Sequence, residues 1–113
     1  DRIIDVFPTD SKSYIRSMLS ESLVAVVAQK LLKKTTGDGR VPACEIMIAN
    51  TAIKNLIRED KIYQIPSLVQ AGGKEGMQTL DQDLQRLLDQ GLITRDDAIQ
   101  IAEKPEIFEK GVF

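Results

Sequence analysis

Two apolar runs determine the architecture of this chain, Leu23-Val24-Ala25-Val26-Val27-Ala28 and, further along, Val41 to Ala49. Both runs are rich in β-branched residues and favour strands, and the valines favour a first strand that is buried on both faces. Periodicity alone leaves a helix open over the first run. Between the two runs, Gly37-Asp38-Gly39 supplies the positive-φ positions of a tight reversal. We therefore expect an antiparallel β-hairpin over residues 23–49.

Two properties of this hairpin constrain its surroundings. Pro42 cannot donate a ladder hydrogen bond, so it should lie at the start of its strand or face an edge. A two-stranded hairpin that is apolar on both faces is marginal by itself, because at least one face and both edges lack partners. The sequence therefore predicts a hairpin that joins a larger sheet.

Helical patterns flank the hairpin on both sides. Residues 1–8 suggest a helical turn that stops at Pro8, and Asp10 or Ser11 can cap the helix that follows. The apolar positions of that helix share one face. They are Tyr14, Ile15, Met18 and Leu19. After the hairpin, Asn50 or Thr51 can cap a helix.

The second half of the chain continues as short helices. A helix is expected over Ile65–Ala71, with Pro66 tolerated in its first turn, and Gly72-Gly73-Lys74-Glu75-Gly76 is expected to be a flexible connector. Thr79 to Gln82 has the spacing of a capping box. It precedes an amphipathic stripe of leucines. These are Leu80, Leu84, Leu87 and Leu88.

The last segment has its own start and stop signals. Gly91 can close the leucine helix, and Thr94 can cap the next one. Pro105 is expected to end that helix and leave 106–113 as a tail. The inner positions of the Thr94 helix are Ala98, Ile101 and Ala102.

Composition excludes several classes of function. The chain has 113 residues, no histidine and a net charge of -2 with interspersed signs, which suits one domain and argues against nucleic-acid binding. Without histidine there is no Ser-His-Asp triad and no usual general base. The single cysteine, Cys44, excludes an internal disulfide or a multi-cysteine zinc site, and we expect it to be a small buried apolar residue.

No apolar run approaches the roughly 18 residues of a membrane span, and no signal segment precedes the first helix. A reducing cytoplasm is therefore expected, without insertion into a membrane. The absence of an initiator methionine before Asp1 suits a fragment or a processed product.

The remaining candidate sites have plainer interpretations. In the glycine connector, Leu68 stands where a P-loop needs glycine and Glu75 follows Lys74, so the match to a phosphate-binding loop is poor. The carboxylates Asp81, Asp83, Asp96 and Asp97 fall in the first turns of predicted helices, where they complement the helix dipole. We therefore predict no catalytic, cofactor-binding or metal-binding residue in this chain.

One octet has a fixed pattern of polar and apolar positions. It is Ala52-Ile53-Lys54-Asn55-Leu56-Ile57-Arg58-Glu59. On a helix, Ala52, Ile53, Leu56 and Ile57 share one face, and the other four project away from it. The pattern fits an ordinary surface helix or a helix that presents polar groups to a partner. In the second case Arg58 is the natural contact to a carboxylate or a carbonyl.

The order of motifs resembles the PilT-type ATPases that retract type IV pili. The segment 1–8 (DRIIDVFP) resembles the sequence that follows the family's histidine box, and the later motifs follow in order. They are SLVAVVAQKL (22–31), GRVPACEI (39–46), AIKNLIRE (52–59), GMQTLD (76–81) and GLIT (91–94). One departure is Lys54, where the family usually has arginine; this keeps the charge but loses bidentate hydrogen bonding.

The resemblance implies a C-terminal portion of a RecA-like ATPase. The expected fold is α+β and mostly helical: a hairpin at about 23–49 from the edge of a RecA-like sheet, then a C-terminal helical bundle, as a fragment of an α/β P-loop NTPase. The implied domains are 1–50, the end of the ATPase core, and 51–113, a helical subdomain. The ATP- and Mg-binding boxes of the parent would lie upstream of Asp1, so this fragment is expected to bind neither and to be inactive.

The resemblance also implies partners and a place in the cell. The parent would be a hexamer at the inner-membrane base of the pilus machine, in the cytoplasm, in contact with platform proteins. Residues 52–59 would be needed for retraction, by transmitting ATP-driven motion, and not for ATP binding. The short loop Thr35–Arg40 and the lone Cys44 favour the retraction branch over pilus-assembly and type II secretion ATPases, whose usual zinc module is absent. The alternatives are a fragment of those ATPases, or a stand-alone helical adaptor.

Overall fold

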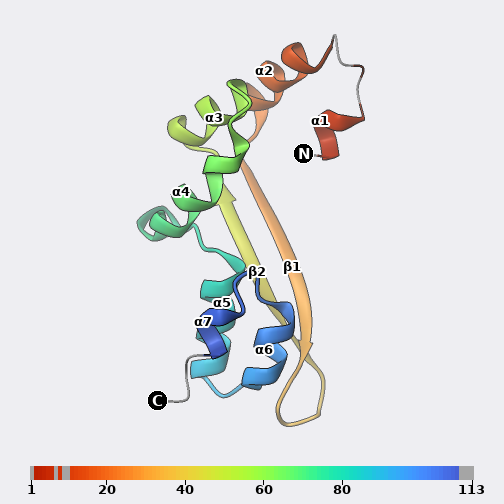
Figure 1. Cartoon of the computed structure of the whole chain (residues 1–113), viewed down its shortest axis with the longest axis vertical. Helices are drawn as coiled ribbons and strands as arrows, with labels where there is room; N and C mark the ends of the chain where they lie inside the picture. The colour runs from red at the N-terminus through yellow and green to blue at the C-terminus, as the bar shows by residue number, and fades with distance from the viewer. Residues whose placement is uncertain (1, 7, 9–10, 110–113) are drawn as a thin grey trace.

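The computed structural model describes residues 2–6, 8 and 11–109. The described part of the chain is mostly helical, with one two-stranded antiparallel sheet (Figure 1), which confirms the predicted α+β class. The elements are α1 Arg2–Asp5, α2 Lys12–Ser22, β1 Ala25–Lys33, β2 Arg40–Ile48, α3 Thr51–Arg58, α4 Ile65–Ala71, α5 Leu80–Asp89, α6 Arg95–Ile101 and α7 Glu106–Glu109. Short 3-10 turns, η2 (Ile62–Gln64) and η3 (Gly73–Glu75), precede and follow α4.

The hairpin forms the long axis of the molecule. Its register pairs Ala25 with Ile48 at one end and Lys33 with Arg40 at the other. Pro42, opposite Leu31, is the third residue of β2 and lies close to the strand's start, as its missing N–H requires. The predicted burial of β1 on both faces is not observed, because only Leu32 of this strand is buried. Within the described residues, no third strand pairs with β1.

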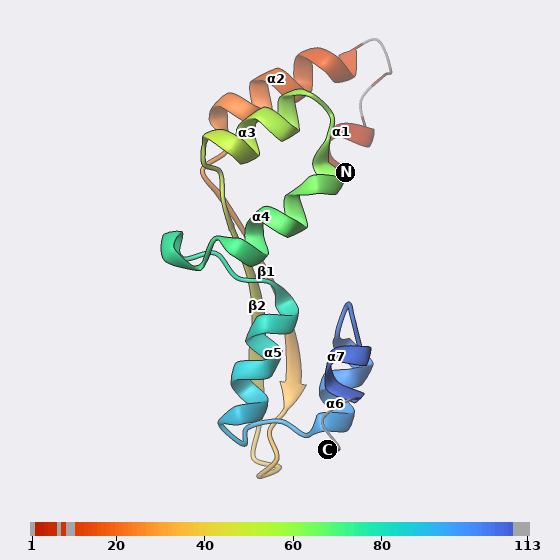
Figure 2. The same ribbon diagram turned by 60° about the vertical axis from the view of Figure 1, so that its left-hand side comes forward.

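The molecule is elongated because its apolar side chains form two separate clusters. It measures 50 × 25 × 22 Å, and its radius of gyration is 16.6 Å, against about 13 Å for a compact domain of this length. The hairpin runs between the two groups of helices (Figure 2). The octet cluster consists of Ile53, Ile57, Val69 and Met77. The C-terminal cluster consists of Leu32, Ala43, Leu80, Leu84, Leu87, Ile93, Ala98 and Phe108.

Residues from both sides of position 50 meet at each cluster. Leu32 and Ala43 pack into the C-terminal cluster, and Leu19 and Met47 pack against the octet cluster. The division into 1–50 and 51–113 therefore stays a prediction about the chain's organisation.

Local signals account for the helix boundaries. The Thr79 side chain and Gln82 form the predicted capping box of α5, and the Thr94 hydroxyl accepts the Asp97 N–H at the start of α6. Gly91, at φ 74°, ends α5 with the reversed backbone of a Schellman motif. The carbonyl groups that follow α5 accept two bonds from Thr35 at the hairpin tip, at 2.7 Å from Gly91 and 2.9 Å from Leu92.

Other segments depart from the expectations. In α2, Ser11 is at the cap position without a side-chain bond, and Tyr14 and Met18 are exposed, so only part of the predicted apolar face is covered; Asp10 lies outside the described residues. The expected tail after Pro105 begins with a helical turn, α7, whose Phe108 is fully buried. The pattern of 106–109 is too short to predict a helix or a core position.

Candidate functional site

The octet forms helix α3 and the residue after it. Asn50 caps the helix, because its Oδ1 accepts the Ile53 N–H at 2.9 Å. The helix ends in a second Schellman motif, in which Lys61 N–H bonds to the Leu56 carbonyl at 2.8 Å and Asp60 has φ 59°. The prediction of a capped helix over these residues is confirmed.

The apolar side of the octet is divided between the core and the surface. Ile53 and Ile57 are buried in the octet cluster, whereas Ala52 is exposed and Leu56 is half-buried. Ala52 and Leu56 line an open hollow between α3 and α4, together with Tyr63, Gln64, Ser67 and Leu68. Two residues therefore hold the helix in place, and two remain at the surface.

The polar side of the octet is at the surface. Arg58 Nη1 donates to Asn55 Oδ1 at 2.8 Å, and Glu59 pairs with Lys61 at 3.4 Å. Arg58 and Glu59 are exposed, and Lys54 is half-buried. Within the described residues, the Lys54 ammonium has no ion pair or hydrogen bond. Most of the hydrogen-bonding capacity of this side is therefore unused inside the chain.

Helix α2 supports the octet from one side. The two helices lie side by side (Figure 2), and Leu19 packs against the octet cluster. Arg16 Nε lies 3.2 Å from Asp60 Oδ1, an ion pair that is not a hydrogen bond. This contact places α2 next to the turn that ends the octet.

The glycine connector does not have the structure of a phosphate-binding loop. It follows helix α4, with no strand leading into it, and it forms the η3 turn. Gly72 is packed so closely that a Cβ there would lie 2.7 Å from Met77 Cε, and Gly76 has φ 90°. The connector is thus a defined turn that places Met77 in the octet cluster. In the described part of the chain, no group of three or more acidic, cysteine or histidine side chains could hold a metal ion.

A buried carboxylate, Asp83, joins α5 to β2, a role beyond the predicted complement to the helix dipole. Asp83 is 3% exposed; its Oδ2 accepts the Cys44 N–H at 2.7 Å and its Oδ1 pairs with Arg86 Nε at 2.7 Å. This bond raises the pKa of the Arg86 guanidinium. The sequence held a signal: Asp83 lies three residues after Leu80 and four before Leu87, on the apolar stripe. Cys44 itself is half-buried and not fully buried as expected.

Gln78 closes the same edge of β2. Its backbone pairs with Ile46 in both directions, at 2.9 and 3.0 Å, and its Nε2 donates to the Cys44 carbonyl at 2.7 Å. Together with Asp83, it satisfies the outer backbone groups of Cys44 and Ile46. This pairing could not be predicted from the sequence, because no periodic pattern surrounds Gln78.

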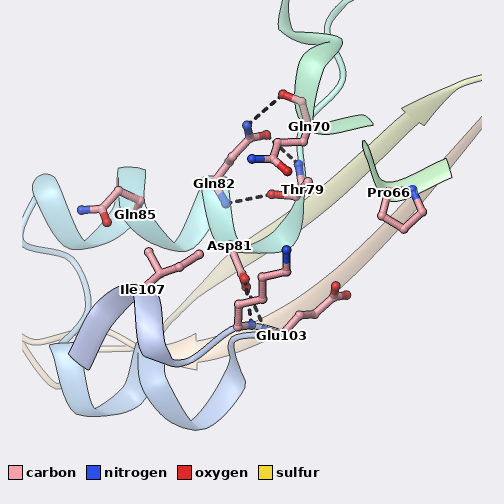
Figure 3. A pocket seen from close by; sticks show the side chains of 9 residues that line it. Pro66, Gln70, Thr79, Asp81, Gln82, Gln85, Glu103 and Ile107 are labelled. Carbon is pink, nitrogen blue, oxygen red and sulfur yellow. Dashed lines mark hydrogen bonds between the residues drawn. The ribbon is translucent and has the colours of Figure 1, made fainter. Parts of the chain in front are cut away.

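A hollow of about 260 Å³ lies between α4, the start of α5 and the link from α6 to α7 (Figure 3). On one side Asp81 accepts the N–H groups of Glu103 and Lys104, each at 2.9 Å. On the other side Gln82 Nε2 donates to the Gln70 carbonyl at 3.1 Å. These polar groups join neighbouring elements, so Asp81 has a structural role in addition to its position near the helix dipole.

Glu45 of β2 lies near two further carboxylates, those of Glu103 and Asp81. Burial raises the pKa of Glu45 above its ordinary value, and the nearby charges of Glu103 and Asp81 raise it further. The folded chain therefore binds this proton more tightly than the unfolded chain does. The proton on Glu45 thus stabilises the folded chain. This contribution to the free energy of unfolding is complete below the ordinary pKa of 4.5 and is lost as pH rises through the raised pKa.

Glu45→Gln is expected to raise stability at pH 7 by about a few tenths of a kcal/mol, because the side chain is only partly buried and solvent screens the neighbouring charges. As pH rises above 4.5, the melting temperature of the variant should also fall less than that of the unsubstituted chain. Melting curves between pH 4 and 8 test this, with the exposed Glu21→Gln as the control. Identical pH profiles for the two variants would show that Glu45 has no such effect.

Comparison with known proteins gives one consistent group of relatives. The chain is 57% identical over 106 residues to a twitching motility protein of Neisseria gonorrhoeae, covering 94% of the chain and 28% of that protein. It is 56% identical over 108 residues to the type IV pilus retraction ATPase PilT of Pseudomonas aeruginosa, covering 96% of the chain and 31% of that protein. The chain thus spans about a third of the length of these relatives. No family model matches it.

Solved structures agree with the sequence relatives. The pilus retraction motor PilT with bound ADP has a TM-score of 0.82 and 44% identity, covering 96% of this chain and 30% of that one. The ATPase DotB of Legionella pneumophila has a TM-score of 0.70 at 17% identity, covering 88% of this chain and 27% of that one, and this likeness concerns the fold alone. Across the described ranges, none of the helices has the length and apolar character needed to cross a membrane.

Proposed function

Because the chain is PilT-like in sequence and in fold, we propose that it is the C-terminal part of a type IV pilus retraction ATPase and transmits ATP-driven motion through its octet. The supporting observation is the division of helix α3. Ile53 and Ile57 bury one side of it, while Arg58 and Glu59 remain exposed on the other. A helix whose apolar side is packed into the core and whose polar side is exposed is suited to transmitting a movement to a bound partner.

The complete protein would bind nucleotide elsewhere. We propose that ATP and Mg²⁺ bind to the parent upstream of Asp1, and that residues 51–113 act as a helical subdomain attached to the ATPase core. A related PilT structure contains ADP, which supports a nucleotide site in the parent. The remaining parts of the proposal are a hexameric assembly, contact with platform proteins and a cytoplasmic position at the inner-membrane base.

The hairpin supports the idea of a larger parent. Asp83 and Gln78 close the outer edge of β2, so a third strand can add only along β1. The side chains of Val26, Val27 and Leu31 are exposed on this strand. An open edge with apolar side chains is unfavourable in water, and pairing with a strand of the parent removes that cost. We propose that β1 is the side on which the hairpin joins the parent's sheet.

The test separates motion from catalysis. In the full-length protein, Arg58→Ala and Glu59→Ala should each reduce twitching about tenfold or more, since a lost contact to a partner can cost 2 kcal/mol or more. ATP hydrolysis should stay within about twofold, because neither side chain belongs to a core cluster. Twitching motility and ATPase rate are measured on the same variants.

Glu21→Ala, on the exposed part of α2, is the matched control, and it should leave both readouts unchanged. An equal loss of twitching and hydrolysis in the Arg58 and Glu59 variants would assign the octet to folding or to the active site.

A further inference from the structure

The junction between β2 and the octet has almost no linker. β2 ends at Ile48, and Asn50 is already the cap of α3. The backbone turns sharply between them, because the Asn50 N–H bonds to the Ile48 carbonyl at 2.8 Å. Ala49 is buried, and its N–H bonds to the Val24 carbonyl at 2.8 Å. The strand end and the cap of the octet helix are therefore separated by one buried residue, Ala49.

Asn50 makes two side-chain contacts in opposite directions. Its Oδ1 accepts the Ile53 N–H, which caps the helix, so its Nδ2 must point away from it. That nitrogen donates to Glu75, at 3.1 Å from Oε2 and 3.4 Å from Oε1. Glu75 is the last residue of the η3 turn, 25 positions further along the chain. The start of the octet is thus attached to the connector as well as to β2.

The connector is itself held against the hairpin. Met77 is buried in the octet cluster, and the next residue, Gln78, pairs with Ile46 of β2. The closely packed Gly72 and the positive φ of Gly76 fix the turn between them. Glu75 therefore approaches Asn50 from a support that is anchored to the same strand.

We infer that Asn50 and Glu75 are positioning residues for the octet: their contact sets the angle between β2 and α3 at which the octet meets its partner. This inference rests on the proposed function. Neither residue lies within 52–59, and neither needs to touch the partner. Cap and contact use different atoms of Asn50, so the two can be separated by substitution.

Asn50→Asp separates them. Aspartate caps helices as well as asparagine does, so α3 should stay folded. It has no N–H to donate, and it places a second carboxylate against Glu75, which replaces attraction by repulsion. Adding Glu75→Gln restores a donor opposite the new carboxylate. Asn50→Asp alone should therefore displace the octet, and the double variant should return it to its place.

The experiment uses the full-length protein. Twitching and ATPase rate are measured on unlabelled variants that keep Glu59 and, except in the Lys74→Ala control, Lys74. The distance between two spin labels is measured separately, on matched variants in which Glu59 and Lys74 are replaced by labelled cysteines after the other cysteines are removed. In Asn50→Asp the distance distribution should shift, and twitching should fall about tenfold, as for a small misplacement of a functional group. ATPase rate should stay within about twofold of the parent's. Asn50→Asp with Glu75→Gln should restore distance and twitching, and the control Lys74→Ala should match the parent in twitching and ATPase rate.

Two results would overturn the inference. One is an unchanged distance in Asn50→Asp, or a shift that the double variant does not reverse. The other is that Asn50→Asp shifts the distance reversibly but leaves twitching intact, while Arg58→Ala in the same protein abolishes twitching. If Arg58→Ala itself leaves twitching intact, the proposed function fails, and the distances alone then decide whether Asn50 and Glu75 position the helix.

Discussion

Phe108→Ala is expected to destabilise the C-terminal cluster by about 3–4 kcal/mol, the usual cost of removing a buried phenylalanine. Phe108 is a fully buried side chain in a cluster that joins α5, α6 and the hairpin. Its backbone carbonyl also accepts a bond from Arg95 Nη1 at 2.8 Å, so α7 is attached to α6 as well. The cavity left by alanine would lie where these elements meet.

Hydrogen exchange of the α5 amides in the full-length protein measures this loss, as about a hundredfold or greater increase in exchange rate. Ile107→Ala is the control, because its side chain is half exposed, and it should increase exchange much less. Equal effects of the two substitutions would mean that α7 does not belong to the core.

Asp83→Ala is expected to cost about 2–3 kcal/mol, because it removes two bonds to a charged group and leaves the Cys44 N–H without a partner. Arg86 adds little to the penalty, since its side chain is about half exposed and water can solvate it. The main effect should be separation of α5 from the edge of β2.

The measurement is hydrogen exchange at Cys44 and its neighbours in β2. Asp83→Asn should lose less than the alanine variant, since its amide oxygen can still accept the Cys44 N–H. Substitution of the exposed Asp89 by alanine should change the free energy of opening, as measured by hydrogen exchange, by less than about 0.5 kcal/mol. If Asp83→Ala leaves β2 as protected as Asp89→Ala does, the buried bond contributes no stability.

Much of the fold follows from local rules that the sequence displays. The glycine-flanked reversal, the Thr79 capping box and the Asn50 cap each depend on residues within a few positions of one another. For the same reason the predicted limits of Ile65–Ala71 match α4. The order of motifs predicted the PilT-like relation, which the relatives confirm.

The rest depends on contacts between distant residues. Asp83 meets Cys44 across 39 positions, and Asn50 meets Glu75 across 25. The position of Asp83 in the first turn of α5 explains a favourable interaction with the helix dipole. It does not reveal the Cys44 N–H of β2, which lies opposite the helix. The burial of β1 was wrongly predicted from its valines, since burial requires a neighbouring strand or layer and not only apolar side chains.

The octet shows both cases within eight residues. Its helix and its apolar side were predictable from spacing, but the separation of Ile53 and Ile57 from Ala52 and Leu56 was not. That separation depends on α4, which leaves an open hollow beside the second pair.

The claim that this chain transmits motion for pilus retraction is tested most directly by placing the chain in a related retraction ATPase. The matching 108 residues of the Pseudomonas retraction ATPase are replaced by this chain, and twitching is measured in cells that lack the native protein. We expect the chimera to restore twitching, and Arg58→Ala within it to abolish twitching while ATP hydrolysis continues. A chimera that accumulates and hydrolyses ATP but does not support twitching would contradict the claim that this chain transmits motion for pilus retraction.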